Sequence, residues 1–216
     1  MNRAVLKSRA KEALGNGIFQ TPWLLAVVVC AIVGLIEGLA AGVTFGIASL
    51  LVTGPLMYGT SYVFLKNARE RNQQIAIEDV FKCFKDDLGG IVLLGLMICI
   101  FTFLWSLLFV IPGIVKAYGY SQAFNIKIDH PEYDWRTCIK ESEKMMAGHK
   151  AELFVLDLSF IGWAILGSFC FGIGTLWVMA YMYATKAEYY QSLIGASVNA
   201  PYAPPVDSYQ NPSGMY

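Results

Sequence analysis

The sequence predicts an all-α membrane protein, a bundle of six transmembrane helices in three hairpins, each hairpin preceded by an amphipathic helix at the membrane interface. Its composition and the positions of its Lys and Arg residues carry this prediction. Of the 216 residues, 56% are hydrophobic and 15% are charged, and the mean hydropathy is +0.50. Such a chain is too apolar to cover the surface of a soluble domain. The formal net charge is zero, so no basic field predicts nucleic-acid binding, and the expected partners are membrane lipids.

Six stretches approach the roughly 17 to 25 mostly apolar residues that a helix needs to cross the hydrocarbon core. They cover residues 23–41, 47–65, 90–110, 113–128, 152–171 and 174–190. Glycine and proline mark the short connection within each hairpin, at residues 42–46, at Pro112-Gly113 and at residues 172–174. We therefore expect one transmembrane domain over residues 1–192. The proline-rich residues 193–216 should form a disordered cytosolic tail.

The positions of Lys and Arg predict the orientation, because these residues collect in the short loops on the cytoplasmic side. The three tight connections carry none, whereas the N-terminus, residues 66–85 and residues 127–150 carry several each. We expect a multi-pass protein with both termini in the cytoplasm. The basic N-terminus ahead of an apolar stretch also resembles a secretory signal peptide, an alternative that the later spans disfavour.

An amphipathic segment precedes each predicted hairpin and ends at a glycine. Spacings of three and four residues place its apolar side chains on one helical face, which is typical of a helix lying at the membrane interface. The alternative is an ordinary surface helix of a cytosolic loop. The apolar residues are Val5, Leu6, Ala10, Ala13 and Leu14 in the first segment, Val80, Phe81, Phe84 and Leu88 in the second, and Trp135, Cys138, Ile139, Met145 and Met146 in the third.

Glu37 is a single carboxylate in the otherwise apolar first span, between Gly34, Gly38 and Gly42. Glycine at every fourth position lets another helix approach closely, so we expect a helix contact on this face. An ionised group that faces lipid costs at least about 2.5 to 3.5 kcal/mol, so Glu37 should lie at that contact or beside a cavity.

Four ionisable residues inside the predicted spans match in depth and form candidate ion pairs. We expect Glu37 to meet Lys116 near the outer side of the membrane and Asp157 to meet Lys186 near the inner side. Either pair would remove the cost of an isolated charge in lipid. In the alternative, both lysines extend to their nearer interfaces and Glu37 is protonated.

The second helix of each predicted hairpin is the more polar one, and the fourth span has a polar face. Tyr118, Ser121, Gln122 and Asn125 recur at i, i+3, i+4 and i+7. A polar face in a membrane should point inward. It could line a path for a substrate or an ion, or it could form hydrogen bonds between helices, and the sequence leaves both open.

Catalytic and metal-binding signatures are missing from the sequence. There is no HExxH, GxSxG or P-loop motif. The five cysteines lie far apart and the two histidines are distant from each other, so we expect no metal, no cofactor and no enzymatic activity. His149 and Lys150, at a predicted membrane boundary, are candidates for contact with a phosphate headgroup.

Two stretches carry a family resemblance. LWSLLFVIPGIVKAYGYSQA, residues 104–123, and KESEKMMAGHKAELFVLDLSFIGWAIL, residues 140–166, followed by ATKAEYY, resemble the bacterial integral membrane proteins grouped as domain of unknown function 975. The resemblance covers residues 1–192 and is most specific in the second and third hairpins. It implies a bacterial plasma membrane protein, of a Gram-positive lineage. It carries no activity and no catalytic residue, and Glu143 stands where a less acidic residue is expected.

Three functions are compatible with these observations. The first is a non-enzymatic membrane adaptor or accessory subunit that binds a protein partner through its cytosolic amphipathic helices and tail. The alternative is a small transporter or channel that uses the polar faces of spans two, four and six. An enzyme acting on lipid headgroups is third, and it would need His149 in an interfacial pocket.

Overall fold

The computed structural model describes residues 3–14, 21–43, 47–70, 75–84, 87–168 and 173–199. Within these ranges there are helices and connecting segments and no strand, which confirms the predicted all-α class. The helices are α1 (Arg3–Leu14), α2 (Thr21–Val43), α3 (Ile47–Arg69), the 3₁₀ helix η1 (Ile77–Phe84), α4 (Leu88–Leu108), α5 (Val110–Tyr120), α6 (Ala123–Asp129), α7 (Trp135–Met145), α8 (Lys150–Ser168) and α9 (Ile173–Asn199).

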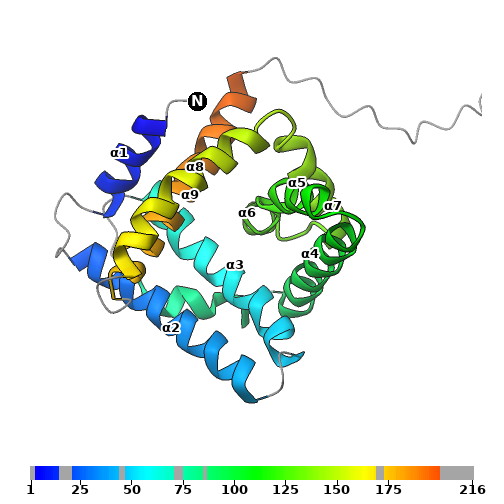
Figure 1. The fold of residues 1–216 in the computed structure, drawn as a ribbon, viewed down its shortest axis with the longest axis horizontal. Coiled ribbons are helices and arrows are strands. Elements are labelled where there is room, and N and C mark those ends of the chain that lie inside the picture. Colours follow the sequence, from blue (N-terminus) through cyan, green and yellow to red (C-terminus); the bar gives the residue numbers. More distant parts are fainter. Residues whose placement is uncertain are drawn as a thin grey trace, which may run out of the picture.

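Five of the predicted spans correspond to single long helices, namely α2, α3, α4, α8 and α9. Helices α3 and α9 are central, since α3 packs against α2, α4, α6, η1 and α9, and α9 also packs against α1, α2 and α8. Figure 1 shows α8 and α9 lying together with α1 beside them, and α2 running in a different direction. The long helices therefore do not form a single parallel bundle.

The predicted fourth span, residues 113–128, is wrong as a continuous helix. It consists of α5 and α6, separated by Ser121 and Gln122. The turn expected at Pro112-Gly113 is also displaced, because the chain reverses at Phe109, which has φ −158° and ψ 139°. Pro112 then falls in the first turn of α5, where the missing proline N–H would have no helical partner anyway.

The amphipathic segments fold onto the rest of the chain. Leu6 and Leu14 of α1 are buried, and α1 packs against α9. Cys138 and Ile139 of α7 are buried as well. The apolar faces of α1 and α7 thus pack against other helices of the protein, where the sequence had predicted contact with the membrane interface. The middle segment is the short 3₁₀ helix η1, in which only part of the apolar set is buried.

Lys127 belongs to the group of lysines assigned to cytoplasmic loops, but its side chain is 5% exposed. Its Nζ donates to the carbonyl oxygens of Pro131 and Tyr133 at 2.8 and 3.0 Å and lies 3.2 Å from Asp87 Oδ2. Asp87 in turn caps α4 by accepting a hydrogen bond from the Gly90 N–H. Lys127 therefore ties α6 to the start of α4.

The predicted start of the tail at residue 193 falls inside helix α9. Helix α9 continues to Asn199, and Leu193 is buried in a cluster with Leu6 and Met146. Residues 193–199 are therefore part of the folded domain. Residues 200–216, the remainder of the predicted tail, lie outside the described residues.

Candidate functional site

The interruption between α5 and α6 is the centre of the candidate site. A break in a helix leaves backbone groups without helical partners, and buried groups of this kind need others. Ser142 of α7 is the partner of two such groups. Its hydroxyl donates a hydrogen bond to the Gly119 carbonyl at 2.7 Å and accepts one from the Gln122 N–H at 3.1 Å. Ser142 is fully buried. One side chain, twenty residues from Gln122 in the sequence, thus stabilises the break.

A cavity of about 250 Å³ adjoins this break, and we call it the central cavity. It is bounded by α3, α4, α5, the α5–α6 break, α6, α8 and α9, and most of its lining comes from the predicted spans two, four and six. The lining residues are Met57, Ser61, Phe64, Ile98, Thr102, Ala117, Tyr120, Ser121, Gln122, Phe124, Asn125, Leu153, Tyr183, Lys186 and Ala187.

Three residues of the predicted polar face line the central cavity and are hydrogen-bonded to one another. Asn125 Nδ2 donates to Gln122 Oε1 at 2.9 Å, and Gln122 Nε2 donates to Ser121 Oγ at 3.2 Å. Across the cavity, the hydroxyl oxygen of Thr102 is buried and has no hydrogen-bond partner among the described residues. A buried hydroxyl without a partner costs roughly 1 to 3 kcal/mol, and it is a group that a bound solute or water could satisfy.

Lys186 is the charged residue that lines the central cavity. Its Nζ lies 3.1 Å from Asp157 Oδ1, so the expected pair of Asp157 and Lys186 is present. The other carboxylate oxygen of Asp157 accepts a hydrogen bond from the Tyr118 hydroxyl at 3.1 Å. Tyr118, the fourth member of the predicted polar face, therefore holds the counter-ion of Lys186 and does not line the cavity.

The predicted pair of Glu37 and Lys116 is wrong. Lys116 Nζ instead donates to Glu143 Oε1 at 2.6 Å and lies 5.2 Å from the centroid of the Trp105 ring. Glu143 comes from α7, which packs against α5. Depth along a helix could not reveal this partner, because α7 lies outside the predicted spans and only the tertiary fold brings it to α5.

Glu37 forms no ion pair with any described residue, and within the described part of the chain no other helix packs closely on Gly34 or Gly38. A Cβ atom added to either glycine would meet nothing within 4 Å, and both residues are exposed. The surroundings of Gly42 lie outside the described part. Close helix contacts occur elsewhere: a Cβ atom on Gly95 of α4 would lie 2.6 Å from the Cα of Gly54 in α3.

His149 and Lys150 lie at the start of α8, as candidates for headgroup contact. His149 Nδ1 lies 3.0 Å from Glu152 Oε2, and the His149 carbonyl accepts a hydrogen bond from the Tyr189 hydroxyl at 3.0 Å. The Lys150 side chain approaches Gly119. His149 does not line the central cavity.

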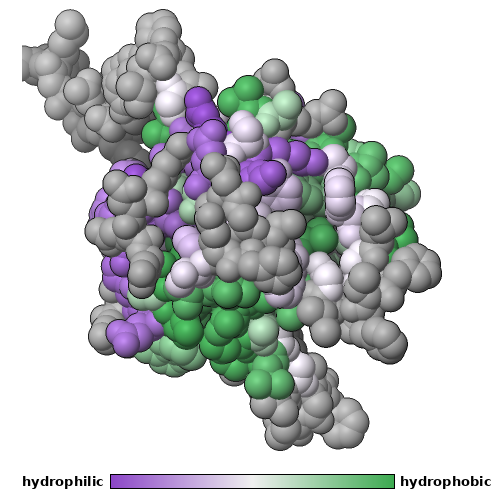
Figure 2. Space-filling model, turned by 90° about the vertical axis from the view of Figure 1, so that its left-hand side faces the viewer, coloured by the Kyte–Doolittle hydropathy of each residue, from purple (hydrophilic) through white to green (hydrophobic). Residues whose placement is uncertain are grey.

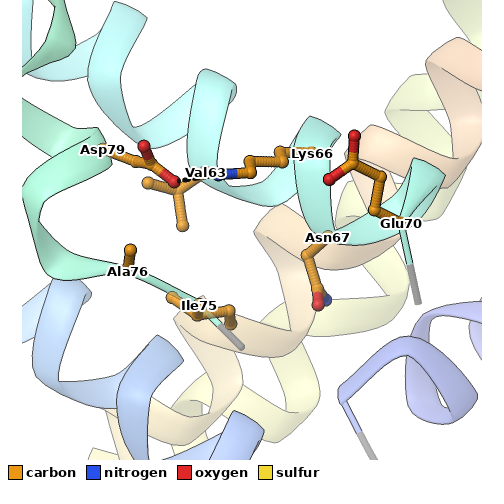
Figure 3. A pocket seen from close by; sticks show the side chains of 7 residues that line it. All are labelled: Val63, Lys66, Asn67, Glu70, Ile75, Ala76 and Asp79. Atoms are coloured by element: carbon orange, nitrogen blue, oxygen red, sulfur yellow. Dashed lines mark hydrogen bonds and ion pairs between the residues drawn. The ribbon is translucent and has the colours of Figure 1, made fainter. Parts of the chain in front are cut away.

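A second pocket lies between α3 and η1 (Figure 3). Lys66 Nζ reaches across it to Asp79 Oδ2 at 2.7 Å, and Asn67 Nδ2 donates to the Ala13 carbonyl at 3.1 Å. Its volume of about 10 Å³ is that of at most one water molecule. This pocket therefore belongs to the packing of η1 on α3 and is too small for a larger ligand.

Within the described residues, no three His, Cys, Asp or Glu side chains gather in a way that could hold a metal ion. Cys138 is fully buried, and burial raises the pKa of its thiol to about 11. A neutral buried thiol is a poor nucleophile and a poor metal ligand.

The surface of the long helices defines the class of the protein. Residues Thr21–Gly38 of α2 and Leu88–Leu108, the whole of α4, are long and apolar enough to cross a membrane. Only 28% and 11% of these residues are buried, so neither is the enclosed core helix of a soluble domain. Figure 2 shows a broad hydrophobic area beside a hydrophilic one on the face that includes α1. This is an all-α protein whose surface indicates membrane association.

Residues 107–197 match the family described as Protein of unknown function (DUF975). This region includes the α5–α6 break and α7 to α9, and the resemblance predicted from the sequence is confirmed over it. Comparison with curated proteins and with solved structures found no match.

Sequence reasoning missed three residues of the site, Ser142, Glu143 and Thr102. Ser142 and Glu143 belong to the third amphipathic segment, for which only the apolar residues entered the prediction. Thr102 is a single hydroxyl in an otherwise apolar span. A possible signal was the polarity of Ser121 and Gln122 at mid-helix, since these residues favour a break that needs an external partner.

Proposed function

We propose that the protein is an integral membrane protein that binds a small polar solute in the central cavity. The observation that carries this proposal is the interrupted α5–α6 helix beside that cavity. Non-helical backbone at membrane depth is tolerated only where it is buried in protein or lines a cavity, and interrupted helices of transporters form their substrate sites in this way.

The chemistry of the lining supports a polar solute of modest size. Two amides, five hydroxyls and one ammonium group lie among apolar side chains around a volume of about 250 Å³, somewhat below the roughly 300 to 1,000 Å³ typical of pockets for drug-sized ligands. Gln122, Thr102 and Lys186 offer hydrogen-bond donors to such a solute, and Asp157 is the counter-ion of Lys186. No step of this role needs enzymatic chemistry.

A six-span topology with both termini in the cytoplasm belongs to the same proposal. The distribution of Lys and Arg supports it, as do the lengths of α2, α3, α4, α8 and α9. The topology must also accommodate the different directions of α2 and of the α8–α9 pair (Figure 1). Labelling of single cysteines placed in the predicted outer turns from outside intact cells tests it directly.

The accessibility of the central cavity to water provides the main test. In a variant whose five natural cysteines are replaced, Ala117→Cys places a thiol on the cavity wall. We expect it to react with a water-soluble methanethiosulfonate reagent in nanodiscs. Leu104→Cys, on the exposed apolar face of α4, should not react, because lipid suppresses thiolate formation. Equal labelling of both thiols, or labelling of Leu104→Cys alone, would contradict the proposal.

The protein could transport the solute as well as bind it. An uptake assay with a Lys186 variant separates transport from binding alone. A solute that protects Ala117→Cys from labelling should then be tested for uptake into proteoliposomes. Lys186→Gln should abolish uptake, whereas Lys140→Gln on the exposed side of α7 should not. Protection without uptake would indicate a binding protein.

The adaptor function is a second candidate, and one observation favours it. Phe81 and Phe84 of η1 are 41% and 61% exposed, with ring centroids 6.2 Å apart. Exposed aromatic pairs are typical of protein interfaces. A partner that copurifies with the wild-type protein and is lost from the Phe81→Ser, Phe84→Ser double variant would support an adaptor.

A further inference from the structure

Another large cavity, separate from the central cavity, lies between α1, α2, α8 and α9. It has a volume of about 420 Å³, and we call it the aromatic groove. Volumes of roughly 300 to 1,000 Å³ are typical of ligand sites. One cation and five aromatic residues line it: Lys11, Trp23, Phe160, Trp163, Trp177 and Tyr181.

The aromatic groove has a buried floor and an exposed rim. Trp23 and Phe160 are 6% and 3% exposed, whereas Trp163 is 63% exposed. Tyr181 joins the two floor residues, with ring centroids 5.9 Å from Trp23 and 5.4 Å from Phe160. Trp163 lies on α8, whose other exposed large apolar side chains include Ile161 and Ile165. The groove thus opens at Trp163 on a helix with an apolar exposed surface.

Helix α1 brings positive charge to this groove. Its residues include Arg3, Lys7, Arg9 and Lys11 against one acidic residue, Glu12. Lys7 Nζ lies 4.4 Å above the centroid of the Phe160 ring. The Tyr181 hydroxyl donates to the Lys7 carbonyl at 3.0 Å and fixes α1 over α9. Among the described residues that line the groove, none is acidic.

We propose that the aromatic groove binds one anionic phospholipid of the surrounding bilayer, with its phosphate at Lys11 and an acyl chain along the aromatic floor. The charge of α1 selects an anionic headgroup, since each Lys or Arg near the surface attracts acidic lipids. The aromatic side chains combine an apolar body with a polar edge, which suits the boundary between headgroup and acyl chain. A soluble partner would not need a groove that opens onto apolar surface.

This inference rests on the membrane part of the proposed function and is independent of the central cavity. Trp23, Trp163 and Trp177 are three of the five tryptophans, and the others are Trp105 and Trp135. In a Trp105→Phe, Trp135→Phe background, all tryptophan fluorescence reports on the groove. The probes are nanodiscs or micelles that contain brominated phosphatidylglycerol or brominated phosphatidylcholine, because bromine quenches a nearby indole.

We expect brominated phosphatidylglycerol to quench at a lower mole fraction than brominated phosphatidylcholine. Lys11→Gln should weaken this preference about fivefold, the effect of one cation near a lipid surface. Lys11→Arg should retain it. Lys140→Gln makes the same change in net charge on α7, away from the groove, and should leave the preference unchanged.

Each other result separates the two proposals. Equal quenching by both lipids, or equal loss of preference in Lys11→Gln and Lys140→Gln, would refute the lipid site and leave the membrane protein and its central cavity in place. If neither lipid quenches the exposed Trp163, the membrane proposal fails together with the lipid site. Circular dichroism and size-exclusion chromatography of each variant identify any that does not fold.

Discussion

Replacing Ser142 by alanine should destabilise the protein far more than the loss of one hydroxyl from a surface would. The hydroxyl makes two hydrogen bonds, at 2.7 Å to the Gly119 carbonyl and at 3.1 Å from the Gln122 N–H. Both backbone groups belong to buried residues, and Gln122 is 2% exposed. Without Ser142, each is left without this partner inside the protein.

The magnitude follows from the cost of such groups. A buried donor or acceptor left without a partner costs roughly 1 to 3 kcal/mol. Two of them, with some relief from local rearrangement or an entering water, should lower the free energy of unfolding by about 2 to 4 kcal/mol. The measurement is reversible unfolding of the detergent-solubilised protein by urea or dodecyl sulfate, followed by circular dichroism.

Ser8→Ala provides the matched control. Ser8 is exposed on α1, and its hydroxyl donates to the Val5 carbonyl three residues away at 2.9 Å. Its removal should cost less than about 0.5 kcal/mol, as surface substitutions usually do. If Ser142→Ala loses no more stability than Ser8→Ala, the break does not depend on α7. The Ser142→Ala variant should also change the labelling rate of Ala117→Cys, since the break forms one wall of the central cavity.

Three further predictions follow from the fold. Gly95→Ala should lower the free energy of unfolding by about 1 to 3 kcal/mol, because the added Cβ would lie 2.6 Å from the Gly54 Cα. Gly34→Ala, the control, should leave the free energy of unfolding unchanged or raise it by up to about 1 kcal/mol. Equal effects of the two substitutions in thermal unfolding would contradict the contact between Gly95 and Gly54. The pKa of Asp87 lies below its usual range because the carboxylate accepts a backbone hydrogen bond from the first turn of α4 and faces a lysine of α6. Its contribution to stability is therefore present above the pKa of the unfolded state and is lost as the pH falls through the lower folded pKa. Asp87→Asn, which can still cap the helix, should flatten the acid side of the pH–stability curve, and an unchanged curve would refute this role. Cys138, whose pKa burial raises to about 11, should resist iodoacetamide at pH 8 in the folded protein and react after denaturation; because the folded thiol stays neutral while the unfolded one ionises, its contribution to stability should fall as the pH rises toward that value.

The sequence by itself determined the class of structure. Long apolar stretches with few charges can satisfy their backbone only as helices, so the all-α class and five long helices were predictable from composition and length. The pair of Asp157 and Lys186 was also predictable, because their two helices form a hairpin and the two residues lie at similar distances from the inner ends of these helices. The resemblance to the DUF975 family followed from residues 104–123 and 140–166, which overlap the matched region.

Only the tertiary structure decided how the helices meet one another. Periodicity assigns a residue to a face of its helix, but it does not say which other helix covers that face. Glu143 thus replaced Glu37 as the partner of Lys116, and the close glycine contact lies at Gly95 and not at Gly34.

The interrupted fourth span has the same origin. Residues 113–128 are apolar enough to predict one helix, and the polarity of Ser121 and Gln122 alone does not say which helix would stabilise a break there. The break is stable because α7 folds back and supplies the Ser142 hydroxyl to backbone groups that would otherwise be buried without partners. That contact joins residues twenty or more positions apart, and such pairing depends on the relative placement of helices, which the spacing of residues along one helix does not encode.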